Sequence, residues 1–131
     1  MAEDLMDYWV RLIKPIFPTN AWIVSHFSDN DHIIQIDWNL ENNTKRLNKR
    51  SKKIQIVIKE DAIDQFLEKN KQDRELYGDA LKLFIGERYN HFNPDNDALT
   101  NRSVRTEKWL VSKDILNTLT SSHSLMELFK I

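Results

Sequence analysis

The segment from Ile33 to Lys59 constrains the fold more than any other part of the sequence. It contains two runs of alternating hydrophobic residues, Ile33–Leu40 and Ile54–Lys59, separated by a polar connector without Gly or Pro. Alternate side chains of a β-strand lie on opposite faces, so each run predicts a strand with one buried and one more polar face. The residues predicted to share the buried face are Ile34, Ile36, Trp38 and Leu40 in the first run and Ile54, Ile56 and Ile58 in the second.

The residues before this segment predict a helix followed by another strand. Apolar residues recur at helical spacing from residue 3 to residue 16, and Pro15 and Pro18 then interrupt the chain. Ala21–Phe27 alternates as a strand does, and Ser28–Asp31 has the composition of a turn. The first three strands should therefore form an antiparallel meander.

The residues after Lys59 predict mainly helices. Apolar spacing and turn residues divide this half of the chain into further segments. They are a helix from Glu60, a polar break at Lys69–Gln72, a helix from Asp73 to about Tyr89, a loop over Asn90–Ser103, a strand over Val104–Val111, a helix capped by Ser112 through Leu119, and a terminal helix capped by Ser121 or Ser122.

These elements predict one α+β domain over residues 1–131. The order is α-β-β-β-α-α-β-α, with helices packed on one face of a mainly antiparallel sheet of about four strands. The absence of cysteine excludes disulfides and thiolate metal sites. No apolar run is long enough to span a membrane, and the acidic residues at the start do not fit a signal peptide. We therefore expect a cytoplasmic protein with no membrane contact.

A cluster of cations lies in the connector between the two central strands. The cations of residues 45–53 are Lys45, Arg46, Lys49, Arg50, Lys52 and Lys53. Lys and Arg neutralise phosphates and release counterions, which drives binding to nucleic acid regardless of its sequence. The whole chain has a net charge of −1, so such an attraction would be local. Our first hypothesis is a non-enzymatic domain that contacts nucleic acid or another anionic partner through these residues.

Other roles for the basic segment remain open. It can be a solvated loop, or it can dock on an acidic protein surface, such as the carboxylates between Glu60 and Glu75 of this same chain. The second hypothesis is a protein-interaction or chaperone-like module. Such a module would be a homodimer that uses an exposed sheet edge or a helical face.

The predicted order α-β-β-β-α between Glu3 and Asn70 resembles that of double-stranded-RNA-binding domains. Those domains carry a Lys-Lys-x-Ala-Lys motif at the start of their last helix, where this chain has Lys59-Glu60-Asp61-Ala62. Carboxylates at this point would repel phosphate, and the Gly-Pro-x-His loop of those domains is missing. The same order occurs in dimeric secretion chaperones. The resemblance is topological, and no family is assigned.

Catalytic and metal-binding motifs are weak. The four histidines lack metal-ligand spacing, and the two glycines form no phosphate-binding loop, so we predict no metal site, cofactor or catalytic residue. A third hypothesis is a metal-dependent, nuclease-like enzyme that pairs Asp37 with Lys59 and Glu60 at the end of the next strand. Against it, Val57 occupies the acidic position of an acid-x-Lys motif.

Overall fold

The computed structural model describes residues 5–40, 51–94 and 106–128, with side chains up to residue 121 in the last range. Its elements confirm the predicted α+β class and the predicted order. They are α1 (Leu5–Ile13), the short 3-10 helix η1 (Lys14–Ile16), β1 (Trp22–Ser28), β2 (Asp31–Asp37), β3 (Lys53–Ile58), α2 (Glu60–Leu67), α3 (Lys71–Asn90), β4 (Thr106–Val111) and α4 (Lys113–Leu128).

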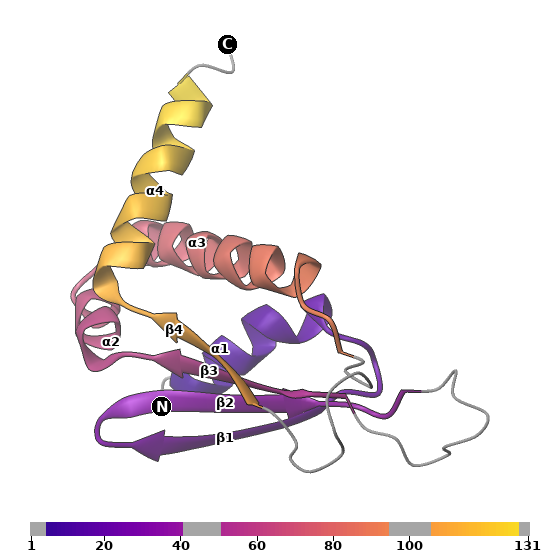
Figure 1. Ribbon diagram of the computed structural model, residues 1–131. Helices are drawn as coiled ribbons and strands as arrows, with labels where there is room; N and C mark the ends of the chain where they lie inside the picture. Colours follow the sequence, from indigo (N-terminus) through magenta and orange to yellow (C-terminus); the bar gives the residue numbers. More distant parts are fainter. Residues whose placement is uncertain (1–4, 41–50, 95–105, 129–131) are drawn as a thin grey trace.

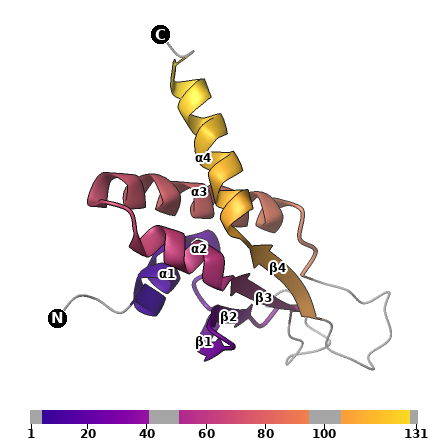
Figure 2. The same cartoon turned by 90° about the vertical axis from the view of Figure 1, so that its left-hand side faces the viewer.

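The four strands form one mixed sheet in the order β1-β2-β3-β4. The predicted meander is confirmed, because β1 pairs antiparallel with β2 and β2 pairs antiparallel with β3. By contrast, β4 lies parallel to β3, since the chain crosses back through α2 and α3 before β4 begins. Helices α1, α2 and α3 lie on the same face of the sheet, and the C-terminal part of α4 extends away from it (Figures 1 and 2).

The hydrophobic core lies between the sheet and these helices. The predicted inward residues of β2 and β3 are buried, and so is Trp38 just after β2. A buried hydrogen bond joins α1 to the sheet, because Trp9 Nε1 donates to His32 Nδ1 over 2.9 Å. The helices contribute Met6, Trp9, Ile13, Ala62, Ile63, Phe66, Tyr77, Ala80, Leu81 and Ile85.

Local sequence explains how the elements begin and turn. Asp29 and Asn30 have φ values of 51° and 70°, which are the left-handed conformations that a two-residue type I′ hairpin requires. Asn70 caps α3 by accepting a hydrogen bond from the Asp73 amide over 2.8 Å. In the same way, Ser112 accepts from the Ile115 amide over 3.3 Å and caps α4, as predicted.

The predicted break before the terminal helix is wrong. Ser121 and Ser122 lie inside a single helix, α4, instead of capping a second one. The hydroxyl of the preceding Thr120 donates to carbonyl oxygens of the previous turn, those of Leu116 at 2.9 Å and Asn117 at 3.0 Å. The Thr120 hydroxyl is thus satisfied within the helix and does not end it.

Candidate binding surface

One face of the sheet is covered by none of the helices that the structure describes. Strand alternation and register place three or four residues of each strand on this face. They are Trp22, Val24, His26 and Ser28 of β1, Asp31, Ile33, Gln35 and Asp37 of β2, Lys53, Gln55 and Val57 of β3, and Thr106, Lys108 and Leu110 of β4. We call this set the uncovered face.

Large apolar side chains stand exposed on the uncovered face. Trp22 is 67% exposed, Leu110 is 52% exposed and Val24 is 44% exposed. Val57 differs, because its register places it between Ile33 and Leu110, and it is buried. Trp22 and Val24 lie on β1, whereas Leu110 lies on β4 at the opposite edge of the sheet.

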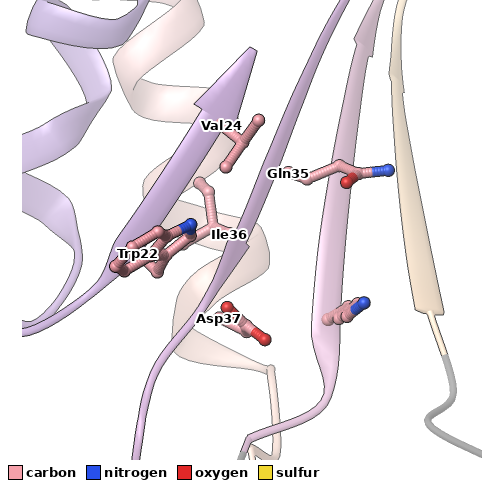
Figure 3. Close-up of a pocket in the computed structure, with 6 residues that line it drawn as sticks. Trp22, Val24, Gln35, Ile36 and Asp37 are labelled. Atoms are coloured by element: carbon pink, nitrogen blue, oxygen red, sulfur yellow. The ribbon is translucent and has the colours of Figure 1, made fainter.

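A shallow pocket of about 390 Å³ lies at one end of this face. It is lined by Trp22 and Val24 of β1, by Gln35, Ile36 and Asp37 of β2, and by Lys53 of β3. Figure 3 shows the Trp22 ring and Val24 on one side, with Gln35 and Asp37 from the neighbouring strand on the other. The pocket therefore combines an aromatic face with an amide, a carboxylate and an ammonium group.

The polar side chains of the uncovered face form a row across the sheet. Gln35 pairs with Gln55, and Gln55 pairs with Lys108, so two amides and an ammonium group lie on adjacent strands. Lys53 pairs with Thr106 one step closer to the pocket, and both Lys53 and Lys108 are exposed. The row presents donors and acceptors next to two cations.

The six predicted cations have different outcomes. Lys45, Arg46, Lys49 and Arg50 lie outside the described residues. Lys52 points toward the helices, where its Nζ lies 3.6 Å from Glu107 Oε1 and 5.1 Å from the centre of the Phe92 ring. Lys53 lies on the uncovered face and lines the pocket. Two neighbouring lysines of the predicted set are therefore separated by the sheet, and Lys53 is the one exposed on the uncovered face.

Ser51 fixes the base of the connector that carries these cations. Its backbone amide donates to the Trp38 carbonyl over 2.8 Å, and its buried hydroxyl accepts from the Trp38 amide over 3.0 Å. The Lys52 amide donates to the Pro94 carbonyl over 3.0 Å. These bonds orient the start of β3, and with it Lys53.

The opposite end of β2 holds a structural ion pair. Lys59 Nζ lies 2.9 Å from Asp31 Oδ2, and Asp31 Oδ1 accepts a hydrogen bond from the Glu60 amide at the start of α2. The hydrogen bond from Lys59 lowers the pKa of Asp31 below its ordinary value of 3.8. Asp37 lies at the other end of β2, so the structure does not bring it to Lys59 and Glu60.

Sequence reasoning missed Trp22 and Lys108 as surface residues. The alternation of β1 was visible, but Trp22 and Val24 on one side are as apolar as Ile23 and Phe27 on the other. The parallel placement of β4 then brings Lys108 beside Gln55, which no local pattern indicates. In β3 the sequence does carry a signal, because the alternation of Lys53 with the buried isoleucines indicates that Lys53 lies on the opposite face.

The described residues contain no group of three His, Asp or Glu side chains that could hold a metal ion. Within the same ranges, no helix combines the length and apolar character needed to cross a membrane. Comparisons with protein-family models, with curated proteins and with solved structures found no significant match to this chain.

Proposed function

We propose that the protein binds single-stranded nucleic acid on the uncovered face of its sheet. The observation that supports this proposal is the exposed Trp22 indole, which lines one pocket together with Lys53 on a face that no described helix covers. Lys45, Arg46, Lys49 and Arg50 precede β3 in the chain, and we include them with Lys53 in the same interaction. The uncovered face would hold the bases, and the cations would follow the backbone.

Stacking on Trp22 supplies the first part of the affinity. Aromatic side chains on open sheets stack on unpaired bases, and each stacked base contributes about 1–3 kcal/mol. In a duplex the bases are already stacked on one another, so no base is free to stack on the indole ring. The geometry therefore favours single strands over duplexes.

Lys53 and Lys108 supply the electrostatic part. Both are exposed on the uncovered face, and their strands β3 and β4 are neighbours. Phosphates that pass over these strands can be neutralised while a base lies against Trp22. Each such phosphate adds about 0.7 to the steepness of log affinity against log salt for a single strand.

The amides of Gln35 and Gln55 lie between the aromatic and cationic parts. They offer both donors and acceptors to the base edges of a splayed strand. The Asp37 carboxylate repels phosphate and accepts hydrogen bonds, so it favours a base with an exposed amino group at the pocket. We expect modest base preference for this reason.

Titration of labelled single-stranded RNA, monitored by fluorescence anisotropy, tests the stacking role. Trp22→Ala should weaken binding by about 5- to 150-fold, which corresponds to the loss of one stacked base. Leu83→Ala is the matched control, because Leu83 is a similarly exposed apolar residue on α3. Equal affinities for the wild type and Trp22→Ala would contradict the proposal.

Intrinsic fluorescence gives a second readout. Trp9, Trp38 and Trp109 are buried, so Trp22 supplies the solvent-exposed emission of the four tryptophans. Stacking of a base should quench that emission in wild-type protein, and Trp22→Phe should abolish the quenching while retaining most of the affinity.

The neighbouring lysines test the electrostatic role. Lys53→Ala should reduce the slope of log affinity against log salt by about 0.7. Lys52→Ala removes the same charge from the adjacent position but should leave the slope unchanged, because Lys52 contacts Glu107 and Phe92 on the helical side. Absence of RNA and DNA binding at about 50 mM salt, where this attraction is strong, would contradict the proposal and make a protein-interaction module the leading hypothesis.

A further inference from the structure

Strand β1 forms an edge of the sheet that lacks the usual protection. Charged residues, prolines and bulges guard most exposed edges against pairing with another strand. Trp22–Ser28 contains no charged residue and no proline, and it pairs with β2 without a bulge. The opposite edge, β4, carries Glu107 and Lys108. Among the described residues, nothing pairs with the outer side of β1.

The hairpin geometry identifies which backbone groups of β1 face outward. The loop has two residues, Asp29 and Asn30, so the flanking pair Ser28 and Asp31 is a hydrogen-bonded pair. Hydrogen-bonded and non-hydrogen-bonded pairs alternate from there along the ladder. The N–H and C=O groups of Ile23, Ser25 and Phe27 therefore point away from β2, toward solvent.

We infer that β1 pairs antiparallel with β1 of a second copy of this chain, about a two-fold axis at Ser25. A register centred on Ser25 is the one that pairs the whole strand Trp22–Ser28 with itself. It sets Ser25 opposite Ser25 of the second copy, and Ile23 opposite Phe27 of the second copy. These are the residues with outward backbone groups, so each pair exchanges hydrogen bonds. The two sheets become one continuous sheet.

The side chains of β1 favour pairing with a second copy of this chain. A two-fold axis brings like residues together, so a strand that pairs with itself must avoid like charges at the contact, and β1 has none. Phe27 is 62% exposed in the single chain, and the pairing covers it with Ile23 of the second copy. On the uncovered face, Val24 meets His26 of the second copy. The exposed apolar surface of β1 is thus reduced on both sides of the sheet.

This assembly does not depend on the proposed nucleic-acid binding, because its hydrogen bonds form along the backbone edge of β1, and on the uncovered face it involves only the side chains of β1. It would place the two uncovered faces side by side. Dimerisation should also persist at high salt, whereas binding to phosphate weakens there. Failure of one proposal therefore does not imply failure of the other.

Light scattering across a concentration series tests the proposal on the full chain. The wild type should reach twice the monomer mass as concentration rises. Ser25→Lys should remain a monomer, because it places two ammonium groups opposite each other at the axis, whereas Ser25→Thr should remain a dimer. Circular dichroism confirms that each variant is folded, since Ser25 is exposed. A wild type that is monomeric throughout, or a dimeric Ser25→Lys variant, overturns the inference.

Amide hydrogen exchange provides a test that needs no substitution. The amides of Ile23, Ser25 and Phe27 should become protected as protein concentration rises, whereas those of Val24 and His26 should be protected at all concentrations. Ser25→Pro should abolish the concentration dependence, because it removes an outward donor without breaking the bonds to β2. Protection of all five amides that does not change with concentration would contradict the pairing.

Discussion

The Ser51 hydroxyl accepts a hydrogen bond from the buried Trp38 backbone amide. Ser51→Ala leaves the Trp38 amide without the acceptor that lies 3.0 Å away, in a site where Ser51 is almost fully buried. An unsatisfied buried donor costs about 1–3 kcal/mol, and we expect a loss of this size in urea unfolding. Ser25→Ala, at an exposed position of β1, should change stability by less than about 0.5 kcal/mol. Equal losses in the two variants would show that the bond contributes nothing.

The ion pair between Asp31 and Lys59 predicts how stability depends on pH. The pKa of Asp31 is lower in the folded protein than its ordinary value of 3.8, because the ionised carboxylate accepts the hydrogen bond from Lys59. Its contribution is therefore fully present above pH 3.8 and is lost as the pH falls through the lower, folded-state pKa. The difference in unfolding free energy between wild type and Asp31→Asn should be constant near neutral pH and should shrink in acid. A difference that stays constant down to about pH 2 would contradict this assignment.

At the scale of elements, β2 should tolerate substitution on one face and resist it on the other. Trp38, which continues the buried side of β2, contacts Phe17, Tyr89 and Phe92, so Trp38→Ala should cost about 3–5 kcal/mol. Gln35→Ala, on the uncovered face, should cost less than about 0.5 kcal/mol. Urea midpoints measure both, and similar shifts for the two variants would mean that the faces are assigned wrongly.

The elements also show what a local pattern can and cannot predict. Alternation identified the buried faces of β2 and β3, because isoleucine and glutamine differ sharply in polarity. In β1 both sides are apolar, and the side that lacks helices is set by tertiary packing. The pairing of β4 with β3 depends on a crossover through α2 and α3. The row that contains Lys108, and with it the candidate surface, depends on the same crossover. The loop cations were recognised by charge alone, and their strand positions separate Lys52 from Lys53.

At the scale of the whole molecule, the net charge of −1 means that an attraction to nucleic acid comes from a local concentration of cations. Lys82 lies on α3, near Asp79, on the helical side of the protein. Lys82→Ala and Lys53→Ala change the net charge equally, yet only Lys53→Ala should weaken RNA binding and flatten its salt dependence. Equal effects in an anisotropy titration at low salt would indicate a response to total charge instead of a defined site.

The parallel position of β4 also predicts an order in which the protein folds. A two-residue turn joins β1 to β2, whereas α2 and α3 separate β3 from β4 in the sequence. Closing that long loop costs more chain entropy, so the meander should be native-like in the transition state for folding and β4 should dock after it. Stopped-flow kinetics should show slower refolding for Ile34→Ala and mainly faster unfolding for Val111→Ala. During synthesis on the ribosome, one edge of β3 should therefore remain unpaired until β4 has emerged.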